Sequence, residues 1–343
     1  NQALVVDTTK YLDQVISFDP ENRRLRAQPG LVLDRLNEIL RPHGLWFPVD
    51  ISTSKQATIG GMTGNNSCGA RSIRYGTIRD NVVSIGAILA NGRRSVFGEI
   101  EEPRFCMNVA SDREILVQKL LQIGRREAGE IESRFPKLMR RVGGYNLDAL
   151  RPDQSGPVNL SHLLVGSEGT LAFFEDIELS LSPLPSHRVL GVCRFGSFHE
   201  AMVATKAIVS LEPTAVELVD RTLIELARDT DLFRDVILEI IQDEVEVVLL
   251  VEFSESDEGE NLRRLRRLGE LVGDLGCDKG LLKIVEPEMQ HAVWEMRKQG
   301  LNIIMSMKGD GKPISFVEDC AVSLENLPEY TARLDAIFKK YSI

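Results

Sequence analysis

The sequence predicts a two-domain α+β protein. Its 343 residues exceed one ordinary hydrophobic core, and strand-like and helix-like patterns alternate along the chain. A proline-rich break at Ser182–Ser186 separates two stretches whose patterns differ. We therefore expect one domain over residues 1–182 and a second over residues 187–343.

In the first domain, short hydrophobic runs typical of strands surround one clear amphipathic helix. Leu33, Leu36 and Leu40 recur on one face of that helix, and Pro42-His43-Gly44 ends it. The expected elements are strands at 4–7, 15–19 and 23–28, a helix at 29–40, strands at 82–90 and 95–97, a helix at 112–128, an irregular excursion over 134–159 and a strand at Leu163.

Beyond the break, strands and helices alternate around strongly hydrophobic strands. This pattern is typical of an α+β sheet covered on one face by helices. The expected strands are 189–195, 215–218, 245–253, 281–285 and 314–322, and the expected helices are 197–211, 221–228, 232–242, 258–275 and one that begins at Pro287.

Composition and charge exclude several classes of protein. A net charge of −10 and a pI near 5.2 disfavour nucleic acid and anionic membranes as partners. No apolar run is long enough to span a membrane, and no signal peptide is recognisable. The sequence therefore predicts a protein with no transmembrane segment and no nucleic-acid partner.

Cysteines and histidines give no pattern of a metal site. The five cysteines are widely spaced without a C-x-x-C pair, which fits reduced thiols in the cytoplasm and argues against iron–sulfur ligands within this chain. The five histidines show no i, i+4 pairing, so no metal site is predicted. Cys68 is interpreted as a small packing residue rather than a nucleophile or a covalent link to a cofactor.

Two glycine-rich segments, Phe47–Gly76 and Leu164–Leu171, are the most informative part of the sequence. Small and amide residues there expose backbone N–H and C=O groups, which favours an anionic cofactor. Neither segment is a P-loop or a G-x-G-x-x-G dinucleotide motif. The alternative for the first segment is a long structural loop. The length of the segment argues against this alternative, because long loops in compact domains are usually functional.

The first segment contains Pro48-x(8)-Ala57-Thr58-Ile59-Gly60-Gly61-x(4)-Asn66-x-x-Gly69-x(4)-Arg74-Tyr75-Gly76. It resembles the second FAD-binding segment of the vanillyl-alcohol oxidase / para-cresol methylhydroxylase (PCMH) flavoproteins, in particular their D-lactate, D-2-hydroxyglutarate and glycolate dehydrogenase group. The run Gly166–Leu171 is similar to the G-S-E-G-T-L loop of that group. By this resemblance, the FAD-binding residues are Pro48, Thr58, Gly60, Gly61, Asn66, Gly69, Tyr75, Gly76, Gly166, Glu168, Gly169 and Ile177.

The resemblance also implies the domain architecture. Residues 1–182 correspond to the second subdomain of a PCMH-type FAD-binding domain, without the first subdomain and its pyrophosphate loop. Residues 187–343 correspond to a substrate or cap domain with an antiparallel sheet covered by helices. The family's H-x-D-G-N-x-H motif, with its metal ligands and catalytic base, would lie beyond Ile343. We therefore expect a fragment that is inactive alone and retains FAD weakly or not at all.

One residue of the second domain is a candidate for substrate binding. The expected helix after Pro287 contains Trp294 and Arg297, and W-x-x-R in the resembled group supplies an arginine that holds the substrate carboxylate. A guanidinium suits this purpose because it donates two parallel hydrogen bonds to a carboxylate. The alternative is a solvated arginine on an amphipathic helix. Lys308 and Lys312 could assist, and only one of Glu318 and Asp319 could face a cavity if they lie on a strand.

The function implied by the resemblance is FAD-dependent oxidation of a D-2-hydroxy acid to the 2-keto acid. Electrons would pass to iron–sulfur clusters in further domains or to a quinone. A cytoplasmic location is expected, with peripheral attachment to the inner membrane and a homodimer left open. Two alternatives remain: an FAD-dependent oxidase or reductase of another alcohol or sugar, and a non-enzymatic α+β module.

Overall fold

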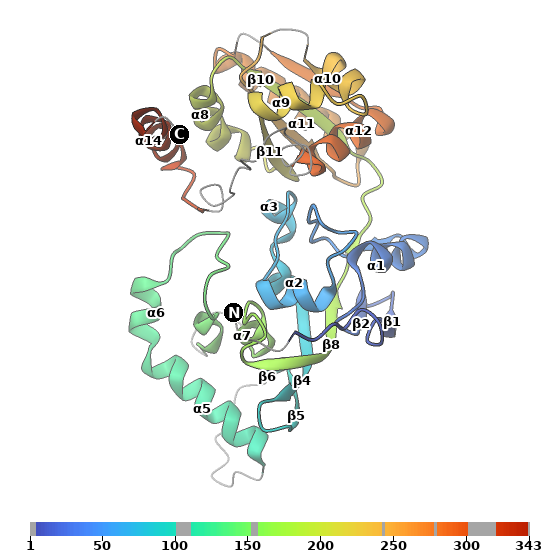
Figure 1. Ribbon diagram of the computed structural model, residues 1–343, viewed down its shortest axis with the longest axis vertical. Helices are drawn as coiled ribbons and strands as arrows, with labels where there is room; N and C mark the ends of the chain where they lie inside the picture. Colours follow the sequence, from blue (N-terminus) through green and yellow to red (C-terminus); the bar gives the residue numbers. More distant parts are fainter. Residues whose placement is uncertain are drawn as a thin grey trace. The chain divides into compact units, whose positions relative to one another are not determined.

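The computed structural model describes residues 5–100, 111–151, 157–241, 244–277, 280–300 and 320–341. The chain divides into two compact units, Asn1–Leu184 and Pro185–Ile343 (Figure 1). Each unit contains its own antiparallel sheet and its own hydrophobic core. No helix in the described part of the chain has the length and apolar character needed to cross a membrane.

A five-stranded antiparallel sheet organises the first unit, in the order β1-β2-β8-β4-β5. Alternate residues such as Leu25, Ile85 and Ile177 are fully buried on one face of this sheet. On the other face, Arg26 donates to Glu178 at 2.8 Å. The strands are β1 (Val15–Asp19), β2 (Arg24–Ala27), β4 (Val82–Leu89), β5 (Arg94–Phe97) and β8 (Ala172–Ser180).

Short helices and strand pairs connect and cover this sheet. Helix α5 packs closely on η2, since a Cβ on Gly124 would collide with the Leu150 carbonyl. The elements are α1 (Leu33–Leu40), η1 (Arg41–His43), β3 (Leu45–Trp46), α2 (Ile59–Asn65), α3 (Ser72–Tyr75), α4 (Ile78–Asn81), β6 (Glu99–Ile100), α5 (Asp112–Arg126), α6 (Ala128–Arg134), η2 (Leu147–Leu150), β7 (Val158–Asn159), α7 (Ser161–Leu164) and β9 (Ser182–Pro183).

Several details of this unit differ from the sequence prediction. Helix α1 begins at Leu33, not at residue 29, because the preceding residues run beside the start of α2, where Ile59 donates to the Leu31 carbonyl at 2.9 Å. Residues 5–7 form no strand and Val5 is exposed. The strand expected at Leu163 is wrong: this residue lies in α7, where the Asn159 side chain accepts from the Ser161 N–H at 2.9 Å and turns the chain.

The second unit is built on a four-stranded antiparallel sheet in the order β11-β12-β10-β13. Helices α8 and α11 pack on one face, where a Cβ on Gly191 would lie 2.6 Å from a Leu268 methyl group. The elements are β10 (Val189–Phe195), α8 (Phe198–Val209), β11 (Ala215–Asp220), α9 (Arg221–Arg228), α10 (Arg234–Ile240), β12 (Val247–Phe253), α11 (Glu258–Asp274), β13 (Leu281–Ile284), α12 (Pro287–Lys298) and α14 (Leu327–Tyr341).

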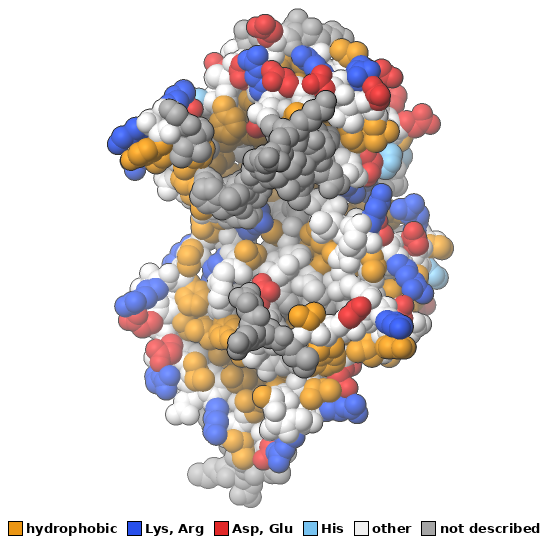
Figure 2. All heavy atoms as spheres, in the orientation of Figure 1, with side chains coloured by type: hydrophobic (Ala, Val, Ile, Leu, Met, Phe, Trp, Pro, Cys, Tyr) orange, Lys and Arg blue, Asp and Glu red, His pale blue; other side chains and the backbone are white. Residues whose placement is uncertain are grey.

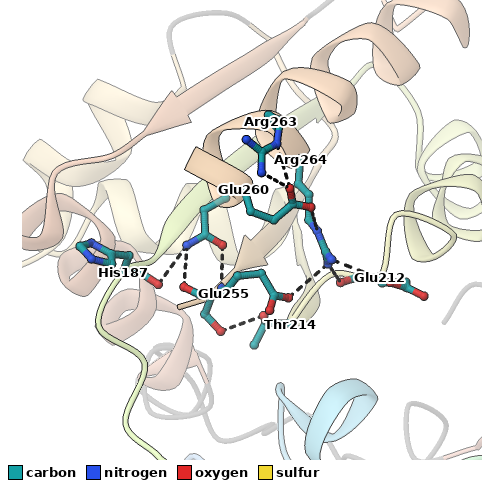
Figure 3. Close-up of polar contacts among 9 residues, drawn as sticks. His187, Glu212, Thr214, Glu255, Glu260, Arg263 and Arg264 are labelled. Atoms are coloured by element: carbon teal, nitrogen blue, oxygen red, sulfur yellow. Dashed lines mark hydrogen bonds and ion pairs between the residues drawn. The ribbon is translucent and has the colours of Figure 1, made fainter. Parts of the chain in front are cut away.

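A polar cluster fixes the connection from β12 to α11 (Figure 3). Arg264 donates to Glu260 at 2.9 Å, lies 3.2 Å from Glu255, and donates to the Glu212 carbonyl at 3.0 Å. Nearby, the hydroxyls of Thr214 and Ser254 share a buried hydrogen bond of 2.9 Å. Each of these groups already has a partner within the unit, so the cluster is structural.

Helix α14 was not predicted, and it packs against α8. None of its side chains is fully buried, and Ile337 and Tyr341 are exposed. Figure 2 accordingly shows hydrophobic side chains on its surface at the upper left of the view. The predicted strand at 314–322 falls mostly outside the described residues.

Candidate functional site

The two glycine-rich segments meet in the first unit. Gly166 donates its backbone N–H to the Thr63 carbonyl at 2.9 Å, and Glu168 donates to the Gly64 carbonyl at 2.9 Å. Both carbonyls belong to the last turn of α2, whose carbonyls have no i+4 partner within the helix. The second segment therefore caps the helix formed by the first.

Left-handed backbone conformations make this junction possible. Asn66 ends α2 with a φ of 53°, and Gly166, Glu168 and Gly169 have φ values of 79°, 51° and 70°. Asparagine and glycine tolerate this region best, whereas a glutamate there is uncommon. Asn66 also accepts from the Arg79 N–H at 2.9 Å, which links the junction to α4.

Many backbone N–H groups in these segments serve the fold rather than a ligand. At the start of α2, Ile59 donates to Leu31, Gly60 donates to the Pro29 carbonyl at 2.7 Å, and Gly61 donates to the Thr58 hydroxyl at 3.2 Å. The N–H groups of Gly166 and Glu168 are used at the other end of the helix. These five N–H groups are therefore already used by contacts within the protein.

The glycines of the two segments divide by what surrounds them. A Cβ on Gly60 would lie 2.5 Å from the Pro29 side chain, and a Cβ on Gly69 would collide with the Asp50 backbone. At Gly64 and Gly169, in contrast, an added Cβ would meet no atom within 4 Å. These two glycines are therefore the positions at which a ligand can approach the backbone most closely.

Gly76 ends the first segment and follows Tyr75 directly. A Cβ on Gly76 would collide with the Asp80 side chain, and Asp80 accepts from the Thr77 N–H at 2.7 Å. The rings of Tyr75 and Trp46 pack edge to face with centroids 5.4 Å apart. The Asp80 and Trp46 side chains therefore hold this end of the segment by packing. Pro48, near the start of the segment, is buried.

Buried donors of this unit that lack a hydrogen-bond partner among the described residues include the Oγ of Ser167, in a residue that is 1% exposed, and the Nε1 of Trp46. Buried polar groups are nearly always paired, so each is a position at which a bound molecule could complete the network. Together with the open glycines, they fit a ligand rich in heteroatoms such as FAD.

The residues expected to bind FAD lie in different places within the first unit. Asn66, Gly166, Glu168 and Gly169 are brought together at the junction, with Thr58, Gly60 and Gly61 at the other end of α2. Ile177 instead lies in the core, paired with Ala27 and Ile85 in the sheet. Whether each of them contacts FAD stays a prediction.

Sequence reasoning missed the loop at 143–148. Asn146 is buried and donates to the carbonyls of Val165 at 2.9 Å and His162 at 3.1 Å. The hydroxyls of Tyr145 and Thr170 share a hydrogen bond of 2.8 Å. The only sequence signal was the pair Gly143-Gly144, which was interpreted as part of an irregular excursion.

Charged groups hold the same loop to α4. Asp148 pairs with Arg79 at 2.8 Å and with Arg141 at 2.7 Å. Burial raises the pKa of the Asp148 carboxyl, but the hydrogen bonds and charges of these arginines outweigh it, so the pKa lies below its usual value. Burial, assisted by the Arg79 charge, lowers the pKa of His162.

In the second unit, the substrate-binding candidate Arg297 lies near the end of α12. Its Nη2 is 2.7 Å from the Oε2 of Glu217 on β11, and its Nε is buried without a partner among the described residues. Lys308, Lys312, Glu318 and Asp319 lie outside the described residues. Over the described ranges, no group of three or more His, Cys, Asp or Glu side chains could hold a metal ion.

Comparisons with known families match both units. Residues 1–98 match the FAD binding domain family, and residues 184–343 match the C-terminal domain of FAD linked oxidases. D-2-hydroxyglutarate dehydrogenases of Pseudomonas putida and Escherichia coli are 31% and 30% identical to the chain, covering 99% and 100% of it and 34% and 35% of the relatives. D-lactate dehydrogenase [cytochrome] of Arabidopsis thaliana is 26% identical over 94% of the chain and 46% of that protein.

The chain therefore spans about a third of the length of the D-2-hydroxyglutarate dehydrogenases it matches. Among solved structures, alkyldihydroxyacetonephosphate synthase superposes with a TM-score of 0.62 at 18% identity, covering 97% of this chain and 56% of the synthase. At this identity the likeness concerns the fold alone. The α+β fold, with an FAD-binding domain and an antiparallel C-terminal domain, is confirmed.

Proposed function

Because the chain belongs to the FAD-linked oxidases, joining an FAD binding domain to their C-terminal domain, we propose that the protein oxidises a D-2-hydroxy acid to the 2-keto acid. FAD is the cofactor that both matched domains indicate. The substrate that we put first is D-2-hydroxyglutarate, with D-lactate and glycolate as the related candidates.

One observation carries this proposal: the similarity to D-2-hydroxyglutarate dehydrogenases runs through 99% of the chain, at 31% identity. It therefore includes the unit expected to bind substrate as well as the unit expected to bind the cofactor. More distant relatives act on D-lactate by their names, and a glycolate oxidase subunit of Bacillus subtilis matches at 24% identity. All of these names refer to 2-hydroxy acids.

In this proposal the first unit holds the cofactor. Gly64 and Gly169 let it approach the backbone, and the Ser167 hydroxyl donates a hydrogen bond to it. When bound, FAD supplies the acceptor for the hydride that leaves C2 of the substrate. We assign the base that takes the hydroxyl proton to no described residue.

The second unit supplies the group that orients the substrate. The Arg297 guanidinium binds the substrate carboxylate and fixes the direction of the C2–H bond. Electrons then leave through iron–sulfur clusters or a quinone, which the resemblance to the D-lactate and glycolate dehydrogenases supports. We place the protein in the cytoplasm because its five cysteines are widely spaced and include no C-x-x-C pair.

Anaerobic bleaching of the flavin in the complete protein tests this function. One of D-2-hydroxyglutarate, D-lactate, glycolate and D-malate is expected to abolish the visible flavin absorbance. If that acid is chiral, its L enantiomer should have no effect. The Arg297→Met variant should bind FAD normally and require far more substrate. A flavin that none of these acids bleaches, while a sugar or another alcohol does, would overturn the hydroxy-acid proposal.

A further inference from the structure

Arg297 is held by a carboxylate from the same unit. Its Nη2 lies 2.7 Å from the Oε2 of Glu217, and the two side chains are only 36% and 22% exposed. An ion pair partly shielded from water is screened less than one on the open surface. The pair therefore fixes where the guanidinium points before any ligand binds.

The strand position of Glu217 makes it a rigid partner. It lies within β11 and pairs with Leu250 of β12, while its neighbours Val216 and Leu218 pack into the core beneath α8 and α11. Because side chains alternate along a strand, Glu217 points to the opposite face of the sheet. There it reaches Arg297 at the end of α12.

Glu217 leaves part of the guanidinium for another ligand. A guanidinium has five N–H donors in one plane, and the ion pair with Glu217 uses Nη2. The Nε is buried and has no partner among the described residues. The Arg297 side chain as a whole is 36% exposed, so a second carboxylate can reach the guanidinium beside Glu217, but it must do so next to a fixed negative charge.

On the basis of the proposed function, we propose that Glu217 is a positioning residue. It orients Arg297 and lowers the affinity of Arg297 for carboxylates. The Glu217–Arg297 pair carries no net charge, so a substrate carboxylate meets a neutral pair instead of an isolated cation. The same holds for the product, which keeps that carboxylate. Weaker binding of both lets the 2-keto acid leave, whereas tighter uniform binding would not speed the chemical step.

Two substitutions at Glu217 should have opposite effects. In Glu217→Gln the amide oxygen still accepts from Nη2 while the charge is lost, so KM for the hydroxy acid and the Kd of the 2-keto acid should fall about 3- to 10-fold, with kcat unchanged or lower. In Glu217→Ala the guanidinium loses its support, so KM should rise about 10-fold and kcat should fall. A purely structural glutamate would not give shifts of opposite sign.

The matched control is Glu246→Gln, which removes the charge from an exposed pair with Arg221 in the same unit. This control should leave KM and the product Kd unchanged. Visible flavin spectra and melting temperatures of each holoprotein report whether the variants fold.

The measurements are steady-state kinetics and calorimetric titration of the complete holoprotein with the hydroxy acid and its 2-keto acid. Opposite shifts for the two Glu217 variants support the inference. Shifts of the same sign, or none, overturn it while the proposed function stands. If the wild-type protein itself binds and oxidises no 2-hydroxy acid, the proposed function fails and the inference fails with it.

Discussion

The backbone N–H of Gly166 donates to the Thr63 carbonyl at 2.9 Å and thereby joins the two glycine-rich segments of the first unit. A second bond, from Glu168 to the Gly64 carbonyl, lies beside it. The candidate cofactor site is thus held together by the protein's own contacts.

Replacing Gly64 by alanine should raise the stability of the flavin-free protein and lower its affinity for FAD. Gly64 lies within α2, and an added Cβ would meet no protein atom within 4 Å. Alanine in a helix is favoured over glycine by about 0.5–1 kcal/mol, so the flavin-free protein should melt at a higher temperature. The methyl group would occupy the ligand's space, so FAD affinity should fall at least about 10-fold in fluorescence titrations.

The matched control for this prediction is Gly273→Ala in α11, where an added Cβ is equally unobstructed. It should raise stability without changing FAD affinity. Equal FAD binding by Gly64→Ala and wild type would show that the ligand does not approach α2 at this position.

Substituting Ser167 by alanine should likewise have opposite effects in the two states. Its Oγ is buried without a partner among the described residues, and an unsatisfied buried hydroxyl costs about 1–3 kcal/mol. The flavin-free variant should therefore be as stable as the wild type or more so, whereas FAD should bind about 10-fold more weakly. Lower stability of the flavin-free variant in urea unfolding would indicate that the hydroxyl serves the fold.

Asn146 should support FAD binding without being part of either glycine-rich segment. Asn146→Ala removes two hydrogen bonds to the chain before Gly166 and should lower the free energy of unfolding by about 2 kcal/mol. Because the loop it supports is loosened, FAD should dissociate faster in stopped-flow measurements. The control is Asn261→Ala, a buried asparagine of the second unit with comparable bonds, which should lose stability but keep its FAD dissociation rate.

His162 should make stability depend on pH below neutrality. Burial lowers its pKa in the folded state, so the unfolded chain binds the proton more readily. The stability that its neutral form contributes is complete above the ordinary histidine pKa and is lost as the pH falls from there through the lowered value. Urea unfolding between pH 8 and pH 5 should show a smaller decline for His162→Gln than for the wild type, and parallel curves would contradict this assignment.

Most regular elements could be predicted from local pattern. The strands β1 and β10 and the helix α9 have the predicted bounds, since alternating or helical spacing of apolar residues is written in adjacent positions. Prediction failed at Leu163, where the Asn159 side chain turns the chain into α7. It also failed to see that residues 59–65 form a helix, because glycine is a poor helix former and the Thr58 cap and the contacts with residues 29–31 compensate for it.

The sequence by itself determined most of the strands and helices in their order and the resemblance to FAD-linked oxidases, because these depend on periodicity and on motifs of adjacent residues. Only the tertiary structure decided that Gly60 and Gly69 pack against Pro29 and Asp50 while Gly64 and Gly169 stay open. It alone also paired Arg297 with Glu217. These relationships join residues far apart in the chain, and packing at such distances leaves no local pattern in the sequence.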